Sequence, residues 1–144
     1  MTQLYGGCHC GNIKLEITLS DTLESYHPRA CDCDFCRSHG AAYISDRNGA
    51  VKMTVAREFD LRRHRQGSGI ADFLICNNCG VLVAVSYQEE AALYMSINSR
   101  AVSAPDKFGD AEATSPKQLS DAERVQRWKE LWFSDTAINI LQKR

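Results

Sequence analysis

The chain has 144 residues, of which 44% are hydrophobic and 24% are charged, and its formal net charge is −1. This length fits one domain, and the composition is that of an ordinary globular protein. Because the net charge is nearly neutral, we expect no overall electrostatic attraction of the protein to nucleic acid or to anionic membranes. No apolar run approaches the ~18 residues of a membrane helix, and the N-terminus lacks the order of a signal peptide, so we expect a cytoplasmic protein.

Alternating polarity predicts a body made of β-strands. Residues 12–19 alternate strictly between apolar and polar side chains, which is typical of a half-buried strand. Residues 72–75, which are apolar after Asp72, lead into a cysteine-containing turn. Further strands are expected at residues 41–45, within residues 51–65 as two strands separated near 58–60, and at residues 81–87 and 93–97.

The C-terminal part has a different composition. Residues 99–119 are rich in polar residues and predict a long loop. Ser120 and Glu123 then have the spacing of a capping box at the start of a helix. The apolar residues that follow at helical spacing are Val125, Trp128, Leu131 and Trp132. A second N-cap signal at residues 134–135 predicts a short last helix through Ile138 and Leu141.

Cysteine is unusually frequent, with seven residues in the chain. An odd number without an export signal does not fit the disulfide framework of a secreted protein. Metal binding is the better explanation, and zinc is the ion that closely spaced cysteine pairs favour in proteins. We therefore expect the cysteines to bind zinc.

Two cysteine pairs can form a closed zinc site. Cys76 and Cys79 form a Cys-x-x-Cys turn followed by Gly80, which is free to adopt a positive φ. Such a turn supplies two sulfurs to one ion and needs a second pair to complete the tetrahedron. Cys8 and Cys10, just before the first predicted strand, can supply that pair.

The remaining cysteines, Cys31, Cys33 and Cys36, form one compact group with no fourth cysteine left for it. Three protein ligands with an open position are typical of a catalytic zinc site. Three thiolates give a formally anionic complex, in which zinc is a weak Lewis acid suited to a substrate thiol. Deprotonation of that thiol favours its addition to an electrophilic carbon, or the reverse reaction. Other groupings of the cysteines stay open at this point.

Polar residues beside the cysteines have two interpretations. Asp32 and Asp34 lie between the ligands and could polarise an open metal site, but aspartates on the protein surface are equally compatible with the sequence. His39 could complete the coordination or act as an acid or base, whereas a solvent-facing histidine is favoured. His9 is expected to point away from the metal.

Two other features have a functional and a structural interpretation. The basic run at residues 62–65 could bind the carboxylates of glutathione or another anion, whereas a solvated strand edge is favoured. Trp128 and Trp132 could cover a substrate pocket, but their spacing more often packs a helix onto a sheet.

The cysteine motifs resemble those of the glutathione-dependent formaldehyde-activating enzyme family, which also contains centromere protein V and shares the zinc-binding Mss4-like fold. Over roughly residues 4–98, the resemblance is carried by Gly7-Cys8-His9-Cys10-Gly11, Cys31-x-Cys33-x-x-Cys36-Arg37, and Phe73 to Gly80 with Cys76-x-x-Cys79-Gly80. It implies a single, mainly β domain in which antiparallel sheets form a β-tent. Residues 99–144 would be a C-terminal loop and helical extension, in place of the family's frequent C-terminal motifs.

The resemblance also implies two zinc ions per chain. Their ligands would be Cys8, Cys10, Cys76 and Cys79 for a structural zinc, and Cys31, Cys33 and Cys36 for a second zinc. At the second ion the thiol of glutathione would meet formaldehyde and give S-hydroxymethylglutathione. We therefore expect a zinc-dependent carbon–sulfur lyase-type enzyme that acts on a thiol such as glutathione and a small aldehyde. A non-catalytic zinc module for protein association and a thiol redox or metal-buffer role stay open as alternatives.

Overall fold

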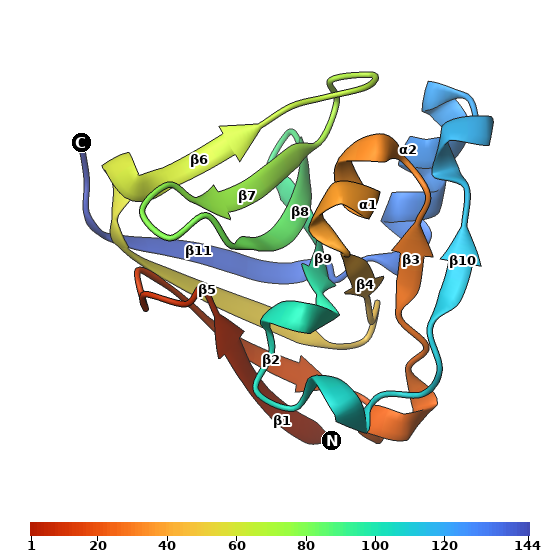
Figure 1. The fold of residues 1–144 in the computed structure, drawn as a ribbon, viewed down its shortest axis with the longest axis horizontal. Coiled ribbons are helices and arrows are strands. Elements are labelled where there is room, and N and C mark those ends of the chain that lie inside the picture. Colours follow the sequence, from red (N-terminus) through yellow and green to blue (C-terminus); the bar gives the residue numbers. More distant parts are fainter.

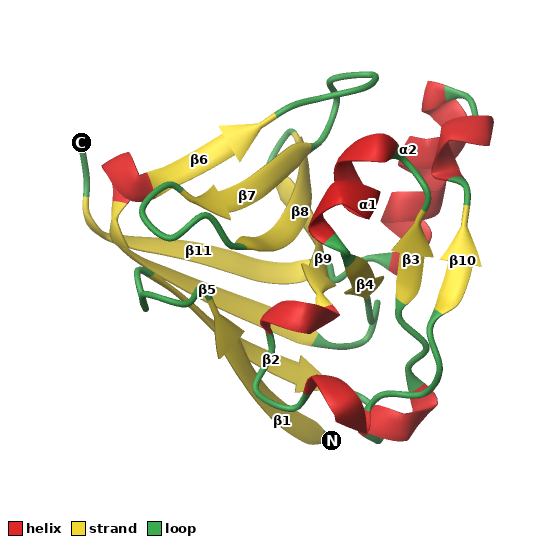
Figure 2. Cartoon of the chain, in the orientation of Figure 1, coloured by secondary structure: helices red, strands yellow, loops and turns green.

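The alternating segments form strands of two sheets in a computed structural model, which describes residues 1–144 (Figures 1 and 2). The first sheet has the order β1-β2-β5-β11, with β11 parallel to β5 and the other neighbours antiparallel. Its strands are β1 (Thr2–Gly7), β2 (Ile13–Leu19), β5 (Ala50–Arg57) and β11 (Asp135–Gln142). In Figure 1 this sheet forms the lower side of the molecule.

The second sheet has the order β10-β3-β4-β9-β8-β7-β6. The β10–β3 pair is parallel, and all other neighbouring strands of this sheet run antiparallel. Its strands are β3 (Arg29–Cys31), β4 (Ala42–Ile44), β6 (Leu61–His64), β7 (Asp72–Cys76), β8 (Leu82–Glu89), β9 (Ala92–Asn98) and β10 (Glu112–Thr114).

Two α-helices and five short 3-10 turns complete the chain. The α-helices are α1 (Asp34–His39) and α2 (Asp121–Leu131). The 3-10 turns are η1 (Leu23–Ser25), η2 (Glu58–Asp60), η3 (Ser99–Ala101), η4 (Pro105–Lys107) and η5 (Pro116–Gln118). Neither α-helix combines the length and the apolar composition that crossing a membrane requires.

The core lies between the two sheets. The apolar face of β2 consists of Ile13, Leu15, Ile17 and Leu19, each at most 1% exposed. These side chains share one cluster with residues of the second sheet such as Leu74 and Met95. The prediction of a mainly β fold with a C-terminal helical segment is therefore confirmed.

The predicted last helix is wrong. Residues 135–142 form strand β11 instead, in which Thr136, Ile138 and Ile140 are half-buried while the residues between them are exposed. This period of two and the β-branched side chains favour a strand, and the open edge of β5 supplies the hydrogen-bond partner. Leu141 is 66% exposed, so it does not share a buried helical face with Ile138.

Three strands besides β11 were not predicted, namely β1, β3 and β10. β1 pairs with β2, although its own sequence contains glycines and no clear alternation. β10 lies within the predicted loop of residues 99–119 and pairs with β3, more than 80 residues earlier in the chain. The capping box at the start of α2 is formed by Ser120 and Glu123, as predicted.

Candidate functional site

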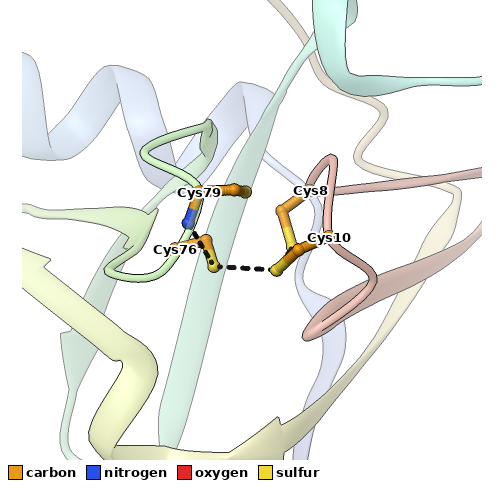
Figure 3. A group of neighbouring side chains, drawn as sticks. All are labelled: Cys8, Cys10, Cys76 and Cys79. Carbon is orange, nitrogen blue, oxygen red and sulfur yellow. Dashed lines mark hydrogen bonds between the residues drawn. The ribbon is translucent and has the colours of Figure 1, made fainter.

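The first cysteine group joins turns that belong to different sheets (Figure 3). Cys8 and Cys10 lie between β1 and β2, whereas Cys76 ends β7 and Cys79 precedes β8. All four sulfur atoms lie within 4.8 Å of one another. An ion bound by these sulfurs would therefore cross-link the two sheets.

The turn that carries Cys8 depends on Gly7. Gly7 has a φ of 144°, and a Cβ atom there would lie 2.1 Å from the carbonyl oxygen of Ile13. This close approach lets the Cys8 amide donate to the Ile13 carbonyl at 2.9 Å. The Ile13 amide in turn donates to the Cys8 sulfur at 3.2 Å, a contact that stabilises a thiolate.

The Cys76–Cys79 turn has the form that its sequence predicts. Gly80 adopts a φ of 83° and donates its amide to the Cys76 carbonyl at 2.7 Å. The Cys79 amide points at the Cys76 sulfur, with 3.5 Å between the two atoms (Figure 3). Both sulfurs are thereby directed to the same side of the turn.

The sulfur spacing of this group fits a tetrahedral zinc ion. Four sulfurs about 2.3 Å from a zinc ion lie roughly 3.8 Å from one another. The Cys8 and Cys10 sulfurs are 3.7 Å apart, and the Cys10 and Cys76 sulfurs are 3.5 Å apart. All of the cysteines are free thiols, so disulfide bonds do not account for this proximity.

The second group is built around the start of α1. Cys31 ends β3, Cys33 is the N-cap of α1, and Cys36 lies in its first turn. The Cys36 amide donates to the Cys33 sulfur at 3.4 Å, and Gly40 closes the helix in the left-handed conformation. These contacts bring the three sulfurs within 4.8 Å of one another.

Hydrogen bonds within the second group favour a thiolate. The hydrogen bond from Cys36 is the main reason that the pKa of Cys31 is lowered to about 6. The same hydrogen bond, together with burial, raises the pKa of Cys36. Burial also raises the pKa of Tyr43, whose hydroxyl oxygen lies 3.2 Å from the Cys36 sulfur. The group therefore favours a thiolate, the form of cysteine that binds a soft metal cation.

The second group lies in the wall of a cavity of about 490 Å³, which all three of its cysteines help to line. Four cationic side chains also line it, namely Arg29, Lys117, Arg124 and Arg127, and no Asp or Glu does. Trp128, Leu131 and Trp132 form an apolar part of the wall. The cavity thus combines a sulfur cluster, positive charge and an apolar surface.

The polar residues next to the second group have other partners. Asp32 accepts a hydrogen bond from Ser115 and lies 3.9 Å from the Lys117 ammonium. Asp34 forms an exposed ion pair with Arg37. His39 is exposed, packs beside the Phe35 ring and does not line the cavity, in agreement with the solvent-facing interpretation.

None of the residues of the basic run at 62–65 lines the cavity, although Gln66, Gly67 and Ser68 directly after the run do. Arg62 and Arg63 are exposed on β6, the edge strand of the second sheet. Arg65 forms an ion pair with Asp72 at 2.8 Å. A solvated strand edge is therefore the correct interpretation, and the cations that line the cavity come from elsewhere in the chain.

The cationic residues that line the cavity were not predicted, although the sequence of α2 contains a pattern that indicates two of them. Arg124, Arg127, Trp128 and Leu131 have the spacing i, i+3, i+4, i+7, so they share one face of the helix. A face that mixes arginine with tryptophan is unlike an ordinary core-facing stripe, which is apolar. Arg29 stands two residues before Cys31, and its sequence context contains no comparable signal.

The comparisons with known proteins agree with this geometry. Residues 3–115 match the family model described as "Glutathione-dependent formaldehyde-activating enzyme". A crystal structure of a Rhodobacter sphaeroides protein, a structural genomics target, has a similar fold with a TM-score of 0.58 and 23% sequence identity. The match covers 76% of this chain and 99% of that one, whereas the search of curated proteins found no match. The chain therefore belongs to the glutathione-dependent formaldehyde-activating enzyme family.

Proposed function

We propose that this protein is a zinc-dependent carbon–sulfur lyase-type enzyme. Its reaction would join the thiol of glutathione, or of a similar molecule, to formaldehyde or another small aldehyde, and would also run in reverse. The observation that carries this proposal is the position of Cys31, Cys33 and Cys36 in the wall of a cavity of about 490 Å³. A purely structural ion would need no adjoining cavity.

Two zinc ions are proposed, with different roles. Cys8, Cys10, Cys76 and Cys79 supply four sulfurs, which complete the coordination of a structural ion. Cys31, Cys33 and Cys36 supply three, which leave one position for a substrate. When bound there, zinc supplies a soft Lewis acid that favours the deprotonated, nucleophilic form of a thiol.

The chain's own residues prepare the site for this reaction. The Tyr43 hydroxyl lies against the Cys36 sulfur and holds that ligand in place. The four cationic side chains of the cavity favour an anionic thiol over a neutral one. In the addition, the sulfur–carbon bond forms, the carbonyl electron pair moves to oxygen, and the thiol proton ends on that oxygen. Because both sites need reduced thiols, we propose that the protein works in the cytoplasm.

Native mass spectrometry under reducing conditions tests this proposal. We expect two zinc ions per chain and, after addition of glutathione, an adduct that is absent from the Cys33→Ser variant. Exchange NMR spectroscopy with ¹³C-formaldehyde and glutathione should show turnover for the unchanged protein and none for that variant. One zinc ion, no adduct and no turnover would overturn the proposal and favour a non-catalytic zinc module.

A further inference from the structure

Part of the cavity wall lies outside the segment that identifies the family. The family model matches residues 3–115, whereas α2 begins at Asp121. One face of α2 nevertheless supplies four lining residues, which are Arg124, Arg127, Trp128 and Leu131. The shape and charge of the cavity in this protein therefore depend on a segment beyond the family match.

The cavity carries positive charge that the neighbouring carboxylates neutralise only in part. Of its four cations, Lys117 lies near Asp32 and Arg124 pairs with Asp121. Arg29 and Arg127 form no ion pair, and Arg29 is half-buried with only the Ser45 hydroxyl, at 2.6 Å, as a hydrogen-bond partner. With Asp32 and Asp121 set against Lys117 and Arg124, the charges of Arg29 and Arg127 are left, and three thiolates with one Zn²⁺, formally −1, reduce the net charge to +1. An anionic ligand would balance this charge.

The apolar part of the wall is held rigidly. The rings of Trp128 and Trp132 are stacked with their centroids 4.8 Å apart, and Tyr87 packs against Trp128 at 5.5 Å. An ion pair of 2.8 Å between Lys129 and Glu89 ties α2 to the end of β8. Formaldehyde contributes only one carbon atom, which is too small to fill contacts with this apolar surface. An aromatic and aliphatic wall instead suits a ligand with an extended apolar group.

We propose that α2 makes the cavity selective for adducts that carry both a carboxylate and an apolar group larger than a single carbon. Arg29 and Arg127 bind the carboxylate, and the Trp128–Trp132 pair with Leu131 contacts the apolar group. The substrate class is thus an anionic thiol joined to a larger, hydrophobic aldehyde. This inference rests on the proposed function, since it assigns the substrate of the same cavity.

Binding of thioethers tests the inference apart from catalysis. S-methylglutathione and S-hexylglutathione have the same carboxylates and no free thiol, so neither can add to an aldehyde. We expect calorimetry on the zinc-loaded protein to show S-hexylglutathione binding at least tenfold more tightly. Burial of about two of its extra methylene groups would suffice for that ratio. Both tryptophans of the chain line the cavity, so their fluorescence should change on binding.

Three variants separate the two parts of the site. Arg127→Gln should weaken both ligands by about three- to tenfold and keep their ratio, because it removes only an anion contact. Arg47→Gln, at an exposed arginine that does not line the cavity, is the matched control and should change neither affinity. Leu131→Gln, at a side chain already 37% exposed, should preserve the fold and abolish the preference for S-hexylglutathione.

The outcomes distinguish this inference from the proposed function. Equal affinity for the two thioethers, or no binding of either, would overturn the apolar part even if glutathione and formaldehyde turn over. An Arg127→Gln variant that behaves like Arg47→Gln would overturn the anion part. Selective thioether binding without turnover would support the proposed selectivity of the cavity. It would contradict only the proposed reaction between the thiol and the aldehyde.

Discussion

The hydroxyl oxygen of Tyr43 lies 3.2 Å from the sulfur of Cys36, and both residues are buried in the wall of the cavity. A hydroxyl in this position donates to the sulfur when the cysteine is a thiolate. Such a contact withdraws charge from the ligand and fixes its direction. Tyr43 is therefore a positioning residue for the three-cysteine group.

Replacing Tyr43 by Phe should lower kcat/KM for the thiol–aldehyde reaction by about tenfold. Without the hydrogen bond, Cys36 donates more charge to zinc, which then lowers the pKa of a bound thiol less. The pH–rate profile should accordingly shift to higher pH, a change that a purely structural defect would not cause. Tyr5→Phe, at a tyrosine 55% exposed, is the control. An unchanged profile in Tyr43→Phe would refute the positioning role.

Removal of one cysteine from each group should have opposite consequences. Cys76→Ser leaves the cross-link between the sheets incomplete, so we expect it to lose at least ~4 kcal/mol of stability or to fail to fold. Cys33→Ser should abolish turnover and cost much less stability, because α1 packs at one end of the second sheet. Circular dichroism melts, metal analysis and turnover measure the contrast. Equal unfolding of both variants would remove the distinction between the groups.

Gly7→Ala should damage the first group specifically. A Cβ atom at this position would lie 2.1 Å from the Ile13 carbonyl oxygen, so the turn that carries Cys8 must move. Gly40→Ala is the matched control, because Gly40 also has a positive φ, of 63°, but no atom within 4 Å of its Cβ position. We expect backbone strain to lower the free energy of unfolding of this control variant by about 1–2 kcal/mol. Gly7→Ala should cost clearly more and release one of two zinc ions in metal analysis.

Asp46 links the end of β2 to the turn before β5 and should make stability depend on pH. Its carboxylate accepts hydrogen bonds from the Ser20 amide at 2.7 Å, from the Tyr26 hydroxyl at 2.6 Å and from the Asn48 amide at 2.9 Å. Burial opposes the charged form, but these hydrogen bonds outweigh it and hold the pKa of Asp46 below its ordinary 3.8. The carboxylate is therefore more acidic in the folded state than in the unfolded state.

Because the pKa of Asp46 is lower in the folded state, the stability should fall as the pH is lowered. The stabilisation from Asp46 is full above about pH 5 and is lost as the pH falls through 3.8 toward the folded-state pKa. Asp46→Asn should cost about 2 kcal/mol at pH 7, and the difference from the unchanged protein should shrink toward pH 3. Urea unfolding at both pH values measures it. Asp106→Asn, at an exposed aspartate, should show no such trend, and a constant difference for Asp46→Asn would contradict the assignment.

Most strands of the core and the cysteine motifs within each group follow from local sequence. β2 is visible because its apolar residues alternate with polar ones, and that pattern needs no partner to be recognised. The Cys76–Cys79 turn and the Cys33–Cys36 helix start are also local, since in each the amide of the second cysteine points at the sulfur of the first. The start of α2 is likewise set by a capping box within four residues.

Contacts between distant segments decided the structure of residues 135–142 and the surroundings of the three-cysteine group. β11 is a strand because β5 offers an open edge, which overrides the N-cap signal at residues 134–135. The cavity exists because the tertiary fold brings α2 to the same cavity as Cys31, which places Arg127 in the same wall as Arg29. Sequence alone therefore determined which residues can bind metal. Only the tertiary structure decided what surrounds the open group, because long-range packing sets the charge and shape of a cavity.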